Sequence, residues 1–153
     1  MDRIDFEIIN HLQNNARISN KSLAAKIGLA PSTCFERVKQ LNDSGVIQGT
    51  HADVLPAVFG IGLEAMYFVG LNKHSRDVVE NFQKDIEQIA EVRTVYLVSG
   101  QHDFLVHVAV KDTDHLRNLA LDSFTIRAEV TRFETVIIFD HSRKFTLPNY
   151  QIK

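Results

Sequence analysis

The chain has 153 residues, of which 44% are hydrophobic and 24% are charged. This composition excludes a disordered or collagen-like chain and leaves room for one ordinary domain or two small ones. The formal net charge of −2 argues against a protein that binds nucleic acid through bulk positive charge alone. The sequence contains no apolar run long enough for a bilayer, no export leader and only one cysteine, so we expect a cytoplasmic protein with no membrane partner.

The first third of the chain has the periodicity of helices. Apolar residues recur every four positions from Ile4 to Leu12, which predicts a helix over residues 2–14. Ser19 is a suitable N-cap for a second helix, and Gly28 stands where a left-handed C-terminal cap would end that helix.

A third helix is predicted to begin at Pro31, because proline is favoured in the first turn of a helix. The spacing of its apolar residues predicts that four side chains are buried: Cys34, Phe35, Val38 and Leu41. After this helix, residues 46–55 have Gly49 and Thr50 in the middle, which favours a short hairpin.

Strands and helices alternate in the rest of the chain. Helices are predicted to begin near Ser75 or Asp77 and near Asp112 or Thr113. The predicted strands cover residues 63–71, 92–98, 104–110 and 130–139. The order βαββαβ predicts an antiparallel four-stranded sheet with both helices on one face. The fold class is therefore α+β.

The strand over residues 104–110 is apolar on both faces. One face carries Phe104, Val106, Val108 and Val110, and the other carries Leu105, His107 and Ala109. Two helices cover only one face of such a sheet, and a face in water would alternate with polar residues. We therefore expect a second copy of the chain to cover the other face in a homodimer. The alternative is a monomer with an exposed apolar patch.

A short turn from Gly28 to Ala30 separates the second and third predicted helices, which is the arrangement of a helix-turn-helix. The outer face of the third helix carries groups that can bond to base edges: Ser32, Thr33, Glu36, Arg37 and Gln40. Asn20 and Lys21, at the start of the second helix, can hold phosphate. This pattern predicts double-stranded DNA as a partner.

The same three helices also fit a packing module without DNA. Residues 1–58 contain six basic and six acidic side chains, so this part of the chain has no net charge. A single neutral head binds DNA weakly, because phosphate neutralisation supplies much of the affinity. A dimer offsets this weakness by presenting two heads at a fixed spacing. The second interpretation is a small-molecule-binding oligomer without DNA-binding activity.

Residues 99–103 form a polar turn between the second and third predicted strands. Gly100 lets a ligand approach the backbone closely, and exposed N–H groups there can bind a carboxylate. Asp103 can bind an ammonium group, so the turn matches both ends of an amino acid. Serine, glycine and aspartate are also common in plain hairpin turns, and on the residues alone both interpretations stay open.

Other chemistries lack the residues that they need. By strand parity His102 and His107 are expected on opposite faces, and no histidine pair has a metal-binding spacing on a predicted helix, so we expect no metal site. We expect no enzyme activity and no cofactor, because no nucleophile with an oriented base is visible. RNA-recognition modules share the βαββαβ order, but their basic aromatic motif is missing between Ser99 and Val108.

One known family combines these features. In the first part of the chain the matching residues are Ile4, Asp5, Ile8, Ile9, Leu12, Gln13, residues 16–20, Leu23, Ala24, residues 27–29, residues 31–34, Arg37, Val38, Leu41, residues 45–47 and Gly49. In the second part they are the strand order and a Gly-x-x-Asp turn, residues 100–103. With these motifs the chain resembles the Lrp/AsnC, or feast/famine, transcription regulators.

The resemblance implies a winged helix-turn-helix domain over residues 1–55, a linker over residues 56–62, and a ferredoxin-like domain for ligand sensing and dimerisation over residues 63–153. It implies a sequence-specific regulator whose oligomeric state or DNA affinity responds to an amino acid or related small effector. It also implies a homodimer that can assemble into an octamer. The implied effector-binding residues are Ser99, Gly100, Gln101, His102, Asp103 and Thr125.

Overall fold

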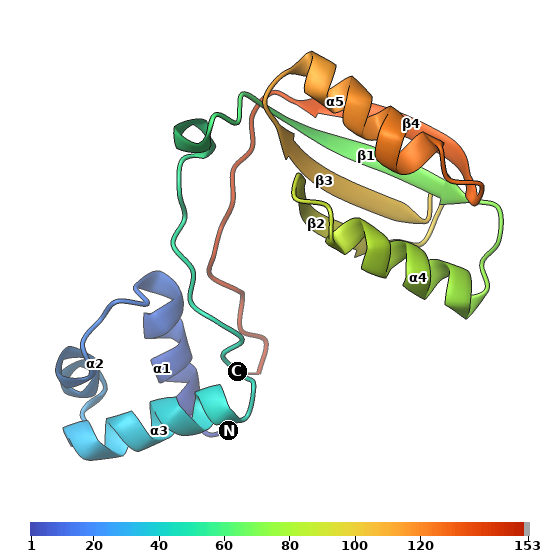
Figure 1. Ribbon diagram of the computed structural model, residues 1–153. Coiled ribbons are helices and arrows are strands. Elements are labelled where there is room, and N and C mark those ends of the chain that lie inside the picture. Colours follow the sequence, from blue (N-terminus) through green and yellow to red (C-terminus); the bar gives the residue numbers. More distant parts are fainter. Residues whose placement is uncertain (152–153) are drawn as a thin grey trace. The chain divides into compact units, whose positions relative to one another are not determined.

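The computed structural model describes residues 1–151 of the chain (Figure 1). These residues form two compact units, which we call the head and the sheet unit. The head consists of Met1–Asp53 together with residues 142–151, and the sheet unit is Val54–His141. No helix among the described residues is long and apolar enough to cross a bilayer.

The boundaries of the units differ in two places from the predicted domains. The predicted linker, residues 56–62, lies in the sheet unit and contains a short 3₁₀ turn, η1 (Pro56–Phe59). Residues 142–151, predicted to belong to the second domain, lie with the head instead. There the backbone N–H of Leu147 donates a hydrogen bond to Oε1 of Gln13 at 2.7 Å.

Three helices build the head: α1 (Arg3–Asn14), α2 (Asn20–Ile27) and α3 (Pro31–Asp43). Their ends follow local capping chemistry. Asp2 and Asp5 form a capping box at the start of α1, and the Ser19 side chain accepts a hydrogen bond from the backbone N–H of Ser22 at the start of α2. Gly28 ends α2 with a φ of 70°, a left-handed conformation that favours glycine. The fully buried side chains of the head are Ile8, Leu23, Ala24, Cys34 and Leu41.

Two expectations for the head are wrong. Phe35, predicted to be buried, is 54% exposed, because it lies about 100° around α3 from the buried Cys34. Residues 46–55, predicted to form a hairpin, contain no strand, and nearly all of their side chains are exposed. A two-stranded hairpin with no partner to pack against is marginal in water, which accounts for the extended path of this segment.

The sheet unit has the predicted order of elements. Its strands are β1 (Leu63–Leu71), β2 (Val92–Leu97), β3 (Phe104–Val110) and β4 (Val130–Ile138). They form one antiparallel sheet in the order β2-β3-β1-β4. Its helices are α4 (Arg76–Glu87) and α5 (Thr113–Leu119), and α5 continues into a π-helical turn, η2 (Ala120–Thr125). All four strands lie within one residue of their predicted bounds.

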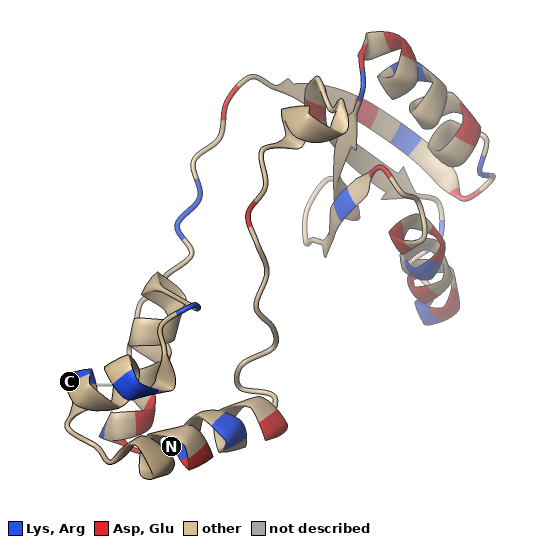
Figure 2. Ribbon diagram, turned by 60° about the vertical axis from the view of Figure 1, so that its left-hand side comes forward, with Lys and Arg blue, Asp and Glu red and all other residues tan. Residues whose placement is uncertain are grey.

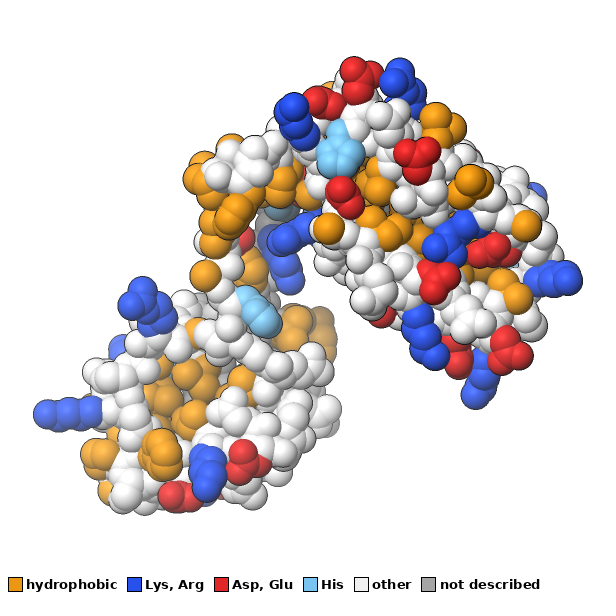
Figure 3. All heavy atoms as spheres, in the orientation of Figure 1, with side chains coloured by type: hydrophobic (Ala, Val, Ile, Leu, Met, Phe, Trp, Pro, Cys, Tyr) orange, Lys and Arg blue, Asp and Glu red, His pale blue; other side chains and the backbone are white. Residues whose placement is uncertain are grey.

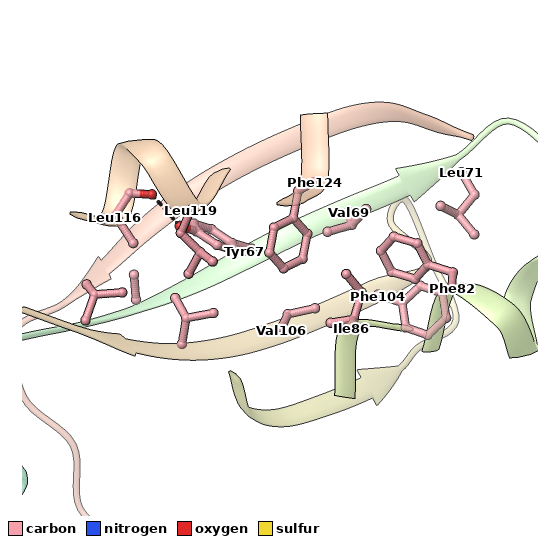
Figure 4. Close-up of a cluster of buried hydrophobic side chains, with 13 residues drawn as sticks. Tyr67, Val69, Leu71, Phe82, Ile86, Phe104, Val106, Leu116, Leu119 and Phe124 are labelled. Carbon is pink, nitrogen blue, oxygen red and sulfur yellow. Dashed lines mark hydrogen bonds between the residues drawn. The ribbon is translucent and has the colours of Figure 1, made fainter. Parts of the chain in front are cut away.

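Both helices pack on one face of this sheet (Figure 4). At the centre of the core lies Tyr67, whose ring contacts Phe124 edge-on and Phe133 at a tilt. Its hydroxyl donates to the carbonyl oxygen of Leu116 at 2.6 Å, which satisfies the buried polar atom and ties α5 to β1. Burial raises the pKa of the Tyr67 phenol, so the group stays a neutral hydrogen-bond donor.

No helix within residues 1–151 packs against the opposite face of the sheet, which we call the bare face. Strand register places on it Met66 and Phe68 of β1, Leu105 and Ala109 of β3, and Val136 and Ile138 of β4. Elsewhere the sheet unit shows charged side chains of both signs over its surface, with apolar atoms between them (Figure 3). The bare face thus carries the predicted apolar side chains, together with the polar residues Glu64, His107 and Glu134.

Candidate functional site

The outer face of α3 presents polar groups to solvent. Ser32, Thr33, Glu36 and Gln40 are all exposed, as the helical periodicity predicts. The N-cap residue of α3 is Ala30, whose side chain has no polar atom that could cap the first backbone N–H groups of the helix. The charged residues of this helix are two of each sign, Glu36, Arg37, Lys39 and Asp43 (Figure 2). The face therefore combines hydroxyl, amide and backbone donors with little net charge.

Arg37 lies on the flank of α3 that contacts α1. Its Nη1 atom lies 2.8 Å from Oδ2 of Asp2 and 2.7 Å from Oδ1 of Asp5. These two hydrogen bonds raise the pKa of the Arg37 guanidinium, and the partly buried side chain is held as a cation between two carboxylates. The contact joins the start of α1 to α3, which is a positioning role that the sequence pattern did not reveal.

The start of α2 is tied to the start of α3. Nδ2 of Asn20 donates to the carbonyl oxygen of Pro31 at 2.7 Å, across the turn between the two helices. Lys21, the next residue, is exposed. The amide of Asn20 thus fixes the angle between the helices, and the ammonium group of Lys21 is accessible to an anion beside them.

The predicted ligand turn is open to solvent. Ser99, Gly100 and Gln101 are exposed, and Gly100 has a φ of 141°, a conformation that L-residues rarely adopt. A Cβ atom added at Gly100 would meet nothing within 4 Å, so backbone conformation, and not space, requires glycine here. The carbonyl oxygen of Gln101 accepts from Nη1 of Arg132 on β4 at 3.4 Å.

Asp103 is already engaged within the chain. Its Oδ2 accepts from the backbone N–H of Leu71 at 2.7 Å, and its Oδ1 lies 2.9 Å from Nε2 of His74. The backbone N–H of Asp103 also donates to the carbonyl oxygen of Val69 at 2.9 Å. The carboxylate therefore anchors the turn to the end of β1. His74 was not singled out by sequence reasoning, because nothing local connects residues so far apart.

His102 points toward the bare face, where its ring contacts Phe68 edge-on with centroids 5.5 Å apart. Its side chain is only 12% exposed, and Nε2 lies 3.3 Å from Oε1 of Glu134 without forming a hydrogen bond to any described residue. His107 also lies on the bare face, with Nε2 2.6 Å from Oε2 of Glu64. The expected opposite placement is wrong, because His102 precedes β3 and strand parity does not apply to it.

The remaining predicted effector residue, Thr125, ends the π turn after α5. Its hydroxyl donates to the carbonyl oxygen of Leu121 at 3.5 Å. Within the part of the chain that the structure describes, no hydrogen bond joins Thr125 to residues 99–103. The structure thus brings together the five residues of the turn and leaves Thr125 outside that contact.

Two hollows lie away from the turn. One, of about 650 Å³, lies in the head between α1 and residues 147–151, and the other, of about 220 Å³, lies beside Gly62 and residues 138–141. Over residues 1–151 no group of three or more His, Cys, Asp or Glu side chains is arranged to hold a metal ion. A ligand at residues 99–103 would bind at an exposed turn, since Ser99, Gly100 and Gln101 are open to solvent.

Two family models match this chain. One, described as winged helix-turn-helix DNA-binding, matches residues 1–48, and the other, described as Lrp/AsnC ligand binding domain, matches residues 64–146. The first match covers most of the head. The second covers most of the sheet unit and residues 142–146 of the C-terminal segment.

Curated relatives and solved structures agree with these matches. The chain is 39% identical to the HTH-type transcriptional regulator AldR of Mycolicibacterium smegmatis over 94% of this chain and 84% of that protein. It is 33% identical to the leucine-responsive regulatory protein of Escherichia coli strain K12 over 94% and 88% of the two chains. A transcriptional regulator from Neisseria meningitidis, solved in complex with L-methionine, superposes with a TM-score of 0.88 at 26% identity, covering 97% and 96% of the chains.

The two matched regions together cover both units, and the relatives align over nearly the whole chain. The helix pair with an exposed α3 and the four-stranded sheet with its Gly-x-x-Asp turn are therefore parts of one known architecture. The chain belongs to the Lrp/AsnC family and is a DNA-binding transcription regulator with a winged helix-turn-helix head and a ligand-binding C-terminal domain.

Proposed function

We propose that the outer face of α3 contacts base edges in the major groove and that an amino acid bound at residues 99–103 changes the affinity of the head for DNA. The observation that carries this proposal is the exposed polar face of α3, held at a fixed angle to α2 by the bond from Asn20 to Pro31. A helix-turn-helix inserts the second helix into the groove with its N-terminal half toward the bases.

Within this surface the residues have different roles. Ser32, Thr33 and Gln40 supply hydroxyl and amide groups for bases or phosphates, and Glu36 can accept from the amino group of a cytosine. Lys21 supplies charge to a phosphate. Asn20 and Arg37 were predicted to contact DNA, and their bonds to Pro31 and to the acids of α1 support positioning roles instead.

The effector in this proposal is an amino acid, because the turn offers both a carboxylate site and an ammonium site. Backbone N–H groups around Gly100 face the carboxylate, and Oδ1 of Asp103 receives the ammonium group in place of His74. The L-methionine in the related Neisseria meningitidis structure supports this ligand class. We propose a purely binding role, without catalysis, in the cytoplasm.

The same proposal includes a homodimer formed through the bare face. No helix among the described residues covers its apolar side chains from β1, β3 and β4, and Val136 among them is 49% exposed. On this face the Glu64–His107 pair is partly buried already, and a second sheet would bury it further as a hydrogen-bonded pair. Because the turn is open, a neighbouring subunit would complete the ligand site, and Thr125 would contribute from that subunit. Dimers can then assemble into an octamer around the ligand.

Selection of duplexes in vitro by the full-length protein tests the DNA-binding surface. We expect a consensus sequence to emerge and the logarithm of its affinity to fall linearly with the logarithm of salt concentration. Lys21→Ala should reduce that salt slope by about one unit without changing the consensus, whereas Gln40→Ala should relax the consensus at one position. The absence of any consensus, or a salt slope near zero, would contradict the proposal and favour a ligand-binding oligomer without DNA.

A further inference from the structure

Phe35 is an apolar side chain at an unexpected place on the surface. It is 54% exposed, whereas its neighbour Cys34 is fully buried. Among the described residues, it is the only large apolar side chain that α1, α2 or α3 exposes to this extent, since Met1 precedes α1 and Val46 follows α3. Single exposed apolar residues are ordinary on protein surfaces, so the location on the helix decides whether Phe35 has a role.

Helical geometry places Phe35 beside the proposed DNA-reading face. With about 100° between successive residues, Ser32 and Lys39 share its side of α3, and all three are exposed. Arg37 lies on the nearly opposite flank, where it bonds to Asp2 and Asp5 of α1. Phe35 therefore lies on the flank away from the Arg37 contact with α1, in the N-terminal half of the helix.

The polar groups of α3 do not supply every kind of contact that can specify a base. Bidentate contacts from arginine to guanine are the commonest specific contacts, but the guanidinium of Arg37 is engaged by two carboxylates. Glu36 is repelled by phosphate. When this surface meets DNA, the ring of Phe35 can remove apolar area from water against an apolar group of the DNA.

The major groove offers one such group on its base edges, the C5-methyl of thymine, and phenylalanine is among the side chains that contact it. We infer that Phe35 packs against a thymine methyl and makes the protein prefer thymine at one position of its operator. This inference rests on the proposed reading surface of α3, and it adds an apolar specificity contact that the polar face alone does not supply.

Replacing thymine by uracil tests the contact, because it removes the methyl group and leaves base pairing intact. Each thymine of a duplex selected by the full-length protein is replaced in turn by deoxyuridine, and the Kd is measured at one salt concentration. We expect one replacement per half-site to weaken wild-type binding about fourfold. Phe35→Ala should bind the original duplex at least as weakly as the wild type binds the duplex with deoxyuridine at that position. The same replacement should not weaken the binding of Phe35→Ala any further. The deoxyuridine replacement should weaken the binding of Phe35→Leu by less than that of the wild type, and it should weaken the binding of Lys39→Ala by the full wild-type factor.

The outcomes separate two failures. If the wild type selects no duplex, the proposed reading surface of α3 and the proposed Phe35 contact are both contradicted. If it selects a duplex but no deoxyuridine replacement weakens binding, or if Phe35→Ala keeps the same sensitivity, the reading surface stands and the Phe35 contact is overturned. A smaller solution mass for Phe35→Ala than for the wild type would also overturn it, since Phe35 would then pack between chains. Because more than half of the Phe35 side chain is exposed, the alanine variant should stay folded, and circular dichroism at the assay temperature checks this.

Discussion

The Asp103 carboxylate joins three segments that lie far apart in sequence. It accepts from the backbone N–H of Leu71, pairs with His74 and holds the end of the turn that contains Gly100. Its role in the structure is therefore to fix the conformation of the turn, and its proposed role in ligand binding depends on that conformation. A ligand ammonium group would compete with His74 for one oxygen atom and leave the bond to Leu71 intact.

Asp103→Asn should lower the free energy of unfolding by about 1–3 kcal/mol, because it removes the charge and sets an NH₂ group against one of the two partners. The same variant should lose any rise in melting temperature that amino acids cause in the wild type. Urea unfolding followed by circular dichroism measures the first effect, and a thermal-shift assay measures the second. Asp122→Asn, at an exposed position after α5, is the control and should change stability by less than about 0.5 kcal/mol. Equal losses in both variants would contradict the anchoring role.

At the scale of helices and strands, most of the fold was predictable because its signals are local. Ser19 begins α2 and Gly28 ends it, each through hydrogen bonds to residues close in sequence. The alternation of residues in β3 correctly predicted its two faces. The antiparallel four-stranded sheet with both helices on one face followed from the order of the elements along the chain. Boundaries were recovered to within one residue for the strands, since turn residues stand directly beside them.

The parts that sequence did not predict depend on contacts between elements. Arg37 belongs to the outer face by periodicity, yet the acids of α1 draw it to one flank. Phe35 fits the apolar spacing of α3, yet the packing of the head leaves its side of the helix uncovered. The pairing of His74 with Asp103 joins residues that no local pattern connects.

The N-terminus of α1 gives a prediction that depends on pH. The hydrogen bond from the backbone N–H of Asp5, followed by the contacts with Arg37, lowers the pKa of Asp2 below its ordinary value of 3.8. Since the folded-state pKa is lower than the unfolded one, the ionised carboxylate stabilises the head above pH 3.8, and this stabilisation is lost as the pH falls through the lowered value. Asp2→Asn keeps a capping side chain and removes the charge.

We therefore expect Asp2→Asn to unfold at a lower temperature than the wild type near neutral pH, with a difference that shrinks as the pH falls below 3.8. Thermal unfolding in a pH series measures this. Asp53→Asn, at an exposed position of the head, should show no such convergence. A difference between Asp2→Asn and the wild type that is independent of pH would rule out the ionised contact as its cause.

At the scale of the whole molecule, the proposed role of the bare face is to set how many heads act together. This face carries apolar side chains from three strands, with Glu64, His107 and Glu134 among them, and monomers rarely leave a large apolar patch in water. Two sheets packed face to face would hold two heads in one particle, which suits a regulator whose individual heads carry balanced charge. The Glu64–His107 pair would then lie within the interface as a matched pair of polar groups.

A charge on this face should separate the subunits. Val136 is 49% exposed on the bare face, so Val136→Glu should fold as a single chain while setting a carboxylate against the second sheet. Sedimentation should give a multiple of 17.4 kDa for the wild type and the mass of one chain for the variant at the same concentration. Asn118→Glu, exposed on α5 on the other side of the sheet, should leave the mass unchanged. An unchanged mass for Val136→Glu would place the interface elsewhere.

The connection between ligand and operator is tested most directly by one titration of the selected duplex. The Kd of the full-length protein is measured alone and with each standard amino acid at millimolar concentration, for the wild type and for Gly100→Val, whose β-branched side chain is strained at a φ of 141°. We expect at least one amino acid to change the wild-type Kd by about 5- to 150-fold and to leave the Kd of the variant unchanged. A wild-type Kd that no amino acid alters would contradict the control of DNA binding by the C-terminal domain.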